Sequence, residues 1–108
     1  MGTKVYVFEG GTLTAASVLQ GTVVATGAKR VIRSAEIVND TGAGIIVTVV
    51  VKDSGGTDRP KISARTIDPG ETYLCPELVN KGLLAAAGVY AVGNGAKFSY
   101  TATEITNG

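Results

Sequence analysis

The residues of this chain that could carry out chemistry are few, and their types exclude most catalytic mechanisms. The sequence has no histidine, nine acidic residues and a single cysteine, Cys75. Without histidine there is no Ser-His-Asp triad, no Cys-His pair and no imidazole ligand for a metal. Zinc needs several cysteine or histidine ligands, which one cysteine cannot supply. Cys75 is therefore expected to be a small buried apolar residue.

The acidic residues lie beside predicted turns and at strand ends, as solvated side chains usually do. Paired carboxylates for glycoside hydrolysis remain conceivable from composition alone. Asp53 and Asp58 flank a Ser-Gly-Gly-Thr loop, but the ligand spacing of an EF-hand calcium loop is absent. The glycine pairs at 42–44 and 93–95 precede strands, so no helix N-terminus is available to hold a phosphate. We predict a non-enzymatic protein with no catalytic residue, no metal site, no cofactor and no small-molecule substrate.

Length and charge narrow the class of protein further. A chain of 108 residues is about the commonest size of one domain, so we expect a single domain over residues 1–108. Ten basic residues against nine acidic ones leave no basic patch for nucleic acid or for an anionic membrane. No apolar run reaches the roughly 18 residues of a membrane helix, and the first nine residues do not read as a secretory signal. A lone cysteine is compatible with a reducing compartment.

The charge content is low for so small a chain. Charged residues make up 18% of the sequence, against about 25% in ordinary domains, and the mean hydropathy is +0.25. One interpretation is a compact domain with a glycine- and threonine-rich surface. The other is that further subunits cover part of the surface, because free monomers rarely keep large apolar patches exposed.

Strand patterns dominate the sequence. Strands are predicted at residues 3–8, 22–26, 30–39, 45–52, 59–67, 72–75, 89–92 and 96–105. Three segments are ambiguous: 12–19 suits a strand or a short helix, 76–82 could form one helical turn, and 83–87 has helical propensity next to a strand. Seven or eight short strands at turn spacings of about 8 to 12 residues predict an all-β fold, an antiparallel β-sandwich of jelly-roll or Ig-like Greek-key type.

Two prolines mark boundaries in this pattern. Pro60 lacks a backbone N–H, so the strand at 59–67 is expected at a sheet edge or opening there. In Asp68-Pro69-Gly70-Glu71, proline presets one backbone angle and glycine supplies the positive φ of the next residue, which predicts a type II turn.

The run from Ile45 to Val51 is apolar on both faces of its predicted strand. Ile46, Thr48 and Val50 form the second face, where a simple sandwich should be polar. Either neighbouring side chains shield this face of a central strand, or it packs against another subunit. These three residues are therefore candidate subunit-interface residues.

Residues 1–9 read as a separable strand before Gly10-Gly11. Val5 and Val7 face one way, and Tyr6 and Phe8 face the other. A strand followed by a flexible glycine pair can add to its own sheet, or can act as an exchangeable arm on a neighbour's edge. Val5, Tyr6, Val7 and Phe8 are the remaining candidate interface residues.

The strand and turn sequence resembles a known family: small β-sandwich structural proteins of tailed-bacteriophage virions. The resemblance covers residues 22–106. Its carriers are the strand 30–39 ending in asparagine, the small-residue turn 40–44, the Val/Thr strand and Ser-Gly-Gly loop to residue 56, the 67–72 turn, Leu74, the 83–88 region and the last strand from Phe98.

The resemblance implies a virion part made in the host cytoplasm: a capsid decoration or cement protein, or a head–tail, collar or tail accessory protein. It implies that the partners are further copies of the chain and other virion proteins, such as the major capsid or tail proteins. The alternative is a carbohydrate-binding or host-adhesion module, which would stack sugars on exposed aromatic rings. The chain offers four tyrosines and two phenylalanines for this, and Phe98 is expected in the core.

Overall fold

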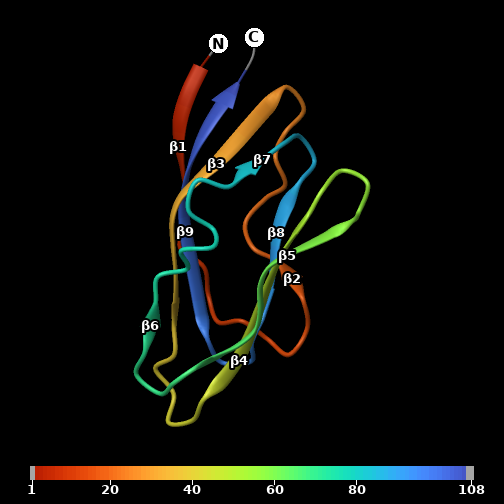
Figure 1. Cartoon of the computed structure of the whole chain (residues 1–108). Coiled ribbons are helices and arrows are strands. Elements are labelled where there is room, and N and C mark those ends of the chain that lie inside the picture. Colours follow the sequence, from red (N-terminus) through yellow and green to blue (C-terminus); the bar gives the residue numbers. More distant parts are fainter. Residues whose placement is uncertain (1, 107–108) are drawn as a thin grey trace.

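A computed structural model describes residues 2–106 as nine strands without a helix (Figure 1). The strands are β1 (Gly2–Phe8), β2 (Val18–Leu19), β3 (Ala28–Val38), β4 (Ile45–Lys52), β5 (Asp58–Ile67), β6 (Thr72–Tyr73), β7 (Gly82–Leu83), β8 (Gly88–Val92) and β9 (Lys97–Thr106). Met1 and residues 107–108, which the predicted domain and N-terminal arm included, lie outside the described residues.

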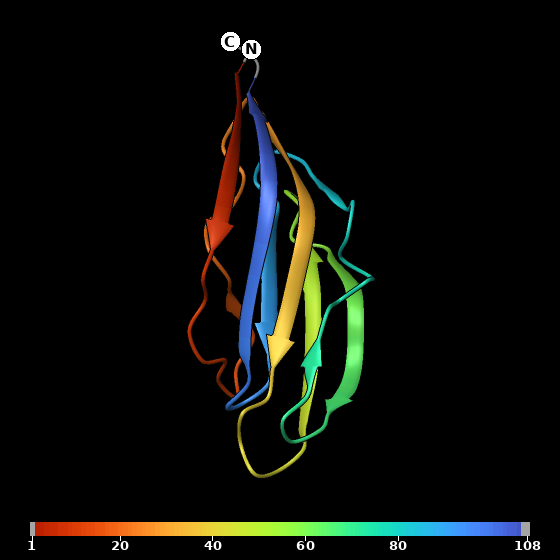
Figure 2. The ribbon, with the colours of Figure 1, turned by 90° about the vertical axis from the view of Figure 1, so that its left-hand side faces the viewer.

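The strands form two antiparallel sheets that pack face to face (Figure 2). One sheet has the order β1-β9-β3-β6, with β7 also paired to β3, and the other has the order β2-β8-β4-β5. The predicted all-β sandwich is therefore confirmed. In the first sheet β9 lies between β1 and β3, and the start of β1 lies beside the end of β9, where Gly2 pairs with Thr106.

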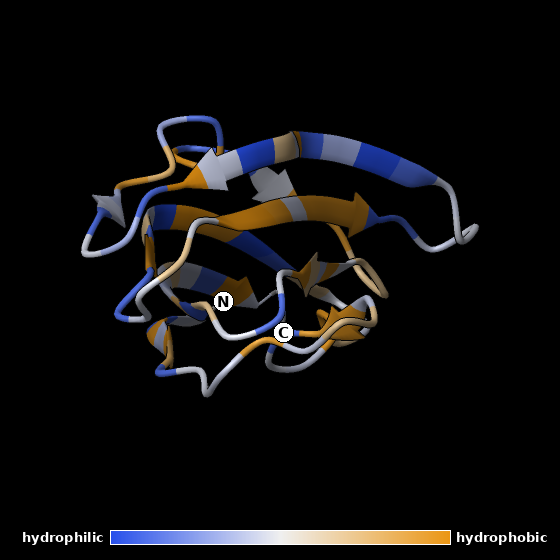
Figure 3. Ribbon diagram, turned by 90° about the horizontal axis from the view of Figure 1, so that it is seen from below, coloured by the Kyte–Doolittle hydropathy of each residue, from blue (hydrophilic) through white to orange (hydrophobic). Residues whose placement is uncertain are grey.

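The core fills the space between the two sheets, because strand residues alternate between inward and outward faces. On β4 the side chains at 45, 47, 49 and 51 are buried, and on β9 those at 98, 100 and 102 are buried. In Figure 3 β4 is a nearly continuous hydrophobic band, whereas β5 at the sheet edge is mostly hydrophilic. The edge position predicted from Pro60 is thus confirmed.

One predicted strand is absent, and two of the ambiguous segments contain no helix. Residues 22–26 form no strand: Val24 makes only two backbone hydrogen bonds, with Ala86 and Ala87, and positive-φ glycines at 21 and 27 bound the segment. Residues 75–81 form successive turns instead of a helical turn, and 83–87 is a short strand and a turn in which Ala86 has a φ of 68°. In each case contacts with neighbouring strands outweigh local propensity.

The turn after β5 has the predicted glycine geometry. Gly70 has a φ of 78°. Its N–H donates to the carbonyl of Asn39 at 2.7 Å, and the N–H of Glu71 donates to that of Asp68 at 3.0 Å. The turn therefore joins the end of β5 to the residue after β3.

Gly70→Val is expected to lower the free energy of unfolding by about 1–2 kcal/mol, because a β-branched residue resists positive φ. A Cβ at Gly70 would meet nothing within 4 Å, so backbone strain alone is tested. Gly42→Val is the matched control, since Gly42 also has open space around it and is not among the positive-φ residues. Equal urea midpoints for the two variants would rule out the strain.

No helix among residues 2–106 has the length and apolar character needed to cross a membrane.

Candidate functional site

The N-terminal strand places its four candidate interface residues on two different faces. Val5 and Val7 point outward and are 69% and 55% exposed. Tyr6 and Phe8 point inward, are half-buried and pack against the core. Their rings lie 6.0 Å and 5.5 Å from the ring of Tyr100. Only the two valines are therefore available to a partner, while the aromatic pair fastens β1 to its own domain.

A buried ion pair lies beneath β1. The guanidinium of Arg30 on β3 donates to one carboxylate oxygen of Glu104 on β9, with distances of 2.8 Å and 3.1 Å. It also donates to the carbonyl of Thr22 at 2.8 Å. The ring of Tyr6 covers this guanidinium at 3.8 Å. The contacts join β1, β3, β9 and the loop after β2 at one end of the sandwich.

The same pair sets the ionisation of Glu104. The hydrogen bonds from Arg30 lower the pKa of the Glu104 carboxyl below its usual 4.5, against the opposing effect of burial. The ammonium of Lys4 on β1 adds to this, because it lies 3.6 Å from the other oxygen of Glu104. The carboxylate is therefore the favoured form, and the charge of Lys4 is directed at its own domain.

The glycine pair after β1 is less flexible than the sequence suggested. A Cβ on Gly10 would overlap the backbone carbonyl oxygen of Phe98 and the ring of Phe8. Gly11 has open space around it. Gly10 is therefore a close-packing position that holds the end of β1 against the start of β9, and only Gly11 is free of such contact.

Gly10→Ala is expected to lower the free energy of unfolding by about 2 kcal/mol, because the backbone of β9 must move to admit the methyl group. Gly11→Ala, the adjacent control, should change stability by less than about 0.5 kcal/mol. Chemical denaturation of both variants checks this. A neutral Gly10→Ala would show that the end of β1 is loosely held.

The second face of β4 is only partly free. Ile46 is 63% exposed, whereas Thr48 and Val50 are half-buried. Val50 lies between Tyr90 on β8 and Pro60 on β5 in the strand register. Lateral neighbours thus cover most of this face, and Ile46 is the one large apolar side chain of β4 that is open to a partner.

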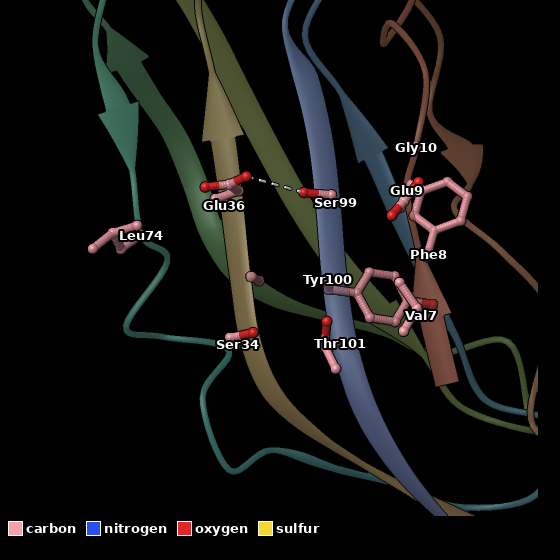
Figure 4. A pocket seen from close by; sticks show the side chains of 11 residues that line it. Val7, Phe8, Glu9, Gly10, Ser34, Glu36, Leu74, Ser99, Tyr100 and Thr101 are labelled. Atoms are coloured by element: carbon pink, nitrogen blue, oxygen red, sulfur yellow. Dashed lines mark hydrogen bonds between the residues drawn. The ribbon is translucent and has the colours of Figure 1, made fainter. Parts of the chain in front are cut away.

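A shallow groove of about 560 Å³ crosses the outer face of the first sheet (Figure 4). Val7 and Leu74 stand at its two sides, and the small polar side chains of Ser34, Ser99 and Thr101 lie between them. Ser99 donates a long hydrogen bond, 3.5 Å, to Glu36. Leu74 is 66% exposed and was not among the predicted interface residues. The groove is suited to apolar contact at its sides.

The groups considered for chemistry have structural surroundings. Cys75 is buried, and burial raises the pKa of its thiol to about 12. One carboxylate oxygen of Asp53 accepts the N–H groups of Gly55 and Thr57, and the other pairs with Arg59 at 3.0 Å. These bonds lower the pKa of the Asp53 carboxyl, and the hydrogen bond from Thr57 has the largest effect. Within residues 2–106 no group of three or more potential metal ligands comes together.

Aromatic rings, which a sugar site would need, are all partly or fully covered. The rings of Phe98 and Tyr100 are buried, and the other four aromatic residues are half-buried. Tyr73 lies under the guanidinium of Arg65 at 3.9 Å and donates to Glu77 at 2.6 Å. Tyr90 lies 4.8 Å from the ammonium of Lys52. No described ring is thus left open as a stacking platform.

Comparisons with solved structures find this fold in other proteins. A chain of infectious bursal disease virus, Gx strain, matches with a TM-score of 0.62 at 13% identity, over 98% of this chain and 33% of the viral chain. A chain of Bacillus endospore appendages, described as disulfide-linked pili, matches with a TM-score of 0.58 at 14% identity, over 99% and 88% of the two chains. A chain of the T13 particle of infectious bursal disease virus gives 0.50 at 12% identity, over 96% and 31%.

These likenesses show a shared fold. This chain spans about a third of the length of the bursal disease virus chains that it matches. No protein-family model matches the sequence, and no curated protein matches it either. The fold is thus one that chains of virus particles and of a bacterial pilus also have.

Proposed function

We propose that this chain is a non-enzymatic structural subunit of a virus particle, which associates with further copies of itself and with other particle proteins. The observation that carries the proposal is a set of large apolar side chains that are more than half exposed on the β-sandwich. They are Val5, Val7, Ile46, Leu74 and Leu84. Val7 and Leu74 flank one groove, and free domains rarely keep contiguous apolar surface exposed, because a partner that covers it gains hydrophobic free energy.

Two further observations support this proposal. The fold recurs in chains of a virus particle and of a pilus, both of which are assemblies of many chains. The sequence resembles structural proteins of tailed-bacteriophage virions, which favours a capsid decoration protein or a head–tail, collar or tail accessory protein. Such a protein would be made in the host cytoplasm and reside in the virion. Carbohydrate binding, the alternative, is less well supported because no described ring is exposed.

The test is the mass of the purified chain in solution together with its presence in purified particles. Sedimentation velocity at micromolar concentration should show a concentration-dependent oligomer. Electron microscopy of particles carrying the chain should show it at a repeated position. A strict monomer that is also absent from purified particles would overturn the proposal.

A further inference from the structure

The two long edge strands of the sandwich differ in how readily a strand of another chain could pair with them. β1 is one edge of the first sheet, and β5 is one edge of the second. The opposite edges carry only the two-residue strands β6, β7 and β2. An edge strand has unpaired N–H and C=O groups along one side, which can pair with another chain unless something prevents it.

β5 carries several features that prevent pairing. Pro60 removes a hydrogen-bond donor. The register of β5 with β4 is interrupted twice. Ala64 has a φ of 48°, which distorts the strand locally. The strand also carries Arg59, Lys61 and Arg65. Edge pairing through β5 is therefore unfavourable.

β1 has fewer of these features. Its seven residues pair with β9 in an unbroken register and include no proline and no positive-φ residue. Its one charged residue, Lys4, directs its ammonium at Glu104 of the same domain. Tyr6 and Phe8 pack against the core and so hold the strand to its own domain. The edge of β1 is thus regular, and its single lysine pairs with Glu104 of its own domain.

We propose that β1 pairs with β1 of a second copy of this chain, antiparallel and about a two-fold axis at Tyr6. This rests on the proposed function and names the contact through which copies associate. Two-fold antiparallel pairing centred there places Val5 opposite the second copy's Val7, and Val7 opposite its Val5. Four exposed valines then cover one another on the outer face, and the first sheets of two copies become one sheet.

A second copy fits this edge better than a different partner for two reasons. The valines stand two positions apart on either side of Tyr6, so the strand is complementary to itself when reversed. The same pairing places Lys4 opposite Phe8, so two like charges do not meet across the axis. A stable interface typically buries about 1,200 Å² or more, and one strand edge buries less. This contact is therefore expected to be weak alone and to gain strength when it is repeated in an assembly.

Cysteine cross-linking tests the contact directly. Mixed Val5→Cys and Val7→Cys chains should form a disulfide-linked dimer at least about tenfold faster than either variant alone. Cys75 is buried and does not compete. Ser54→Cys, exposed in the loop after β4, is the matched control and should stay uncrosslinked. If sedimentation shows an oligomer but the mixture cross-links no faster than the control, β1 pairing is overturned and the proposed function stands. A strict monomer overturns β1 pairing, whereas the proposed function falls only if the chain is also absent from purified particles.

A lock on β1 separates edge pairing from strand exchange. Thr3 lies opposite Ile105 of β9 in the same chain, away from the two valines. A Thr3→Cys, Ile105→Cys double variant, oxidised at high dilution, fixes β1 to its own domain. Under edge pairing the oxidised and reduced forms should show the same oligomer by sedimentation. If oxidation converts the oligomer to monomer, β1 exchanges between domains and the proposal is overturned.

Discussion

Val49→Asp is expected to unfold the protein or to destabilise it by several kcal/mol. Val49 lies at the middle of β4, the strand between β8 and β5, and its side chain is fully buried. An aspartate there would place a carboxylate among apolar side chains with no partner in reach, and the free energy of that burial exceeds what an ordinary core substitution costs. Urea melts and the yield of soluble protein measure the effect.

Ile46→Asp is the matched control for this prediction. It introduces the same charge on the same strand, but at a side chain that is 63% exposed. Stability should fall by less than about 1 kcal/mol, because the carboxylate stays hydrated. If both variants melted alike, the two faces of β4 would not differ as the structure has them. If Ile46→Asp kept its stability but lost oligomer mass, the face that carries Ile46 would be part of an interface.

The long strands could be predicted from the sequence because each carries enough β-branched or alternating residues to define its own face. The strand 45–52 is the clearest case, and its predicted bounds equal those of β4. Of the two-residue strands, β6 falls within the predicted strand 72–75, but β7 could not be predicted. β7 exists because Arg30 and Val31 of β3 offer backbone partners to Leu83 and Gly82, which no local pattern records.

The directions of the candidate interface side chains on β1 could be predicted from the sequence, but the place of β1 at a sheet edge could not. Alternation separates Val5 and Val7 from Tyr6 and Phe8, and the structure has them on opposite faces. That β1 is a regular edge depends on pairings with β9, about 100 positions away in sequence. That the edge of β5 is irregular depends on interruptions in its register with β4, which the sequence pattern does not show.

The buried ion pair was missed, although the pattern contained a sign of it. The inward positions of β9 fall on even numbers, so extending Phe98, Tyr100 and Ala102 reaches Glu104. An acid on the buried face needs a cation beside it. Sequence alone could not show that the cation is Arg30, because that requires the register of β3 with β9.

Arg30→Met is expected to lower the free energy of unfolding by about 3 kcal/mol. It leaves the buried Glu104 carboxylate without its main partner, and such breaks usually cost about 3–5 kcal/mol. The lower end applies because Lys4 remains 3.6 Å away. Arg30→Met with Glu104→Leu should cost clearly less than the two single changes together, because no unpaired charge is then buried. Additive losses in this double-mutant cycle would show that the pair is not coupled.

The ion pair also gives stability a dependence on pH. Because Arg30 lowers the pKa of Glu104 in the folded chain, the unfolded chain binds the proton more readily, at the usual pKa of 4.5. The contribution is therefore fully present above this value and is lost as pH falls through it towards the folded pKa. Asp40 and Asp53 also have lowered pKa values and add to the same acid loss.

Glu104→Gln should be less stable than the parent at neutral pH and should lose less stability on acidification. Lys4→Met is the control: its ammonium is largely exposed, so stability at neutral pH should change by less than about 0.5 kcal/mol. Denaturation midpoints measured from neutral pH to about pH 3 compare the three chains. Parallel curves for Glu104→Gln and the parent would mean that the carboxylate beneath β1 does not depend on Arg30 for its charge. The edge strand would then be held by its pairing with β9 and by the Tyr6 and Phe8 rings, without a contribution from the ion pair.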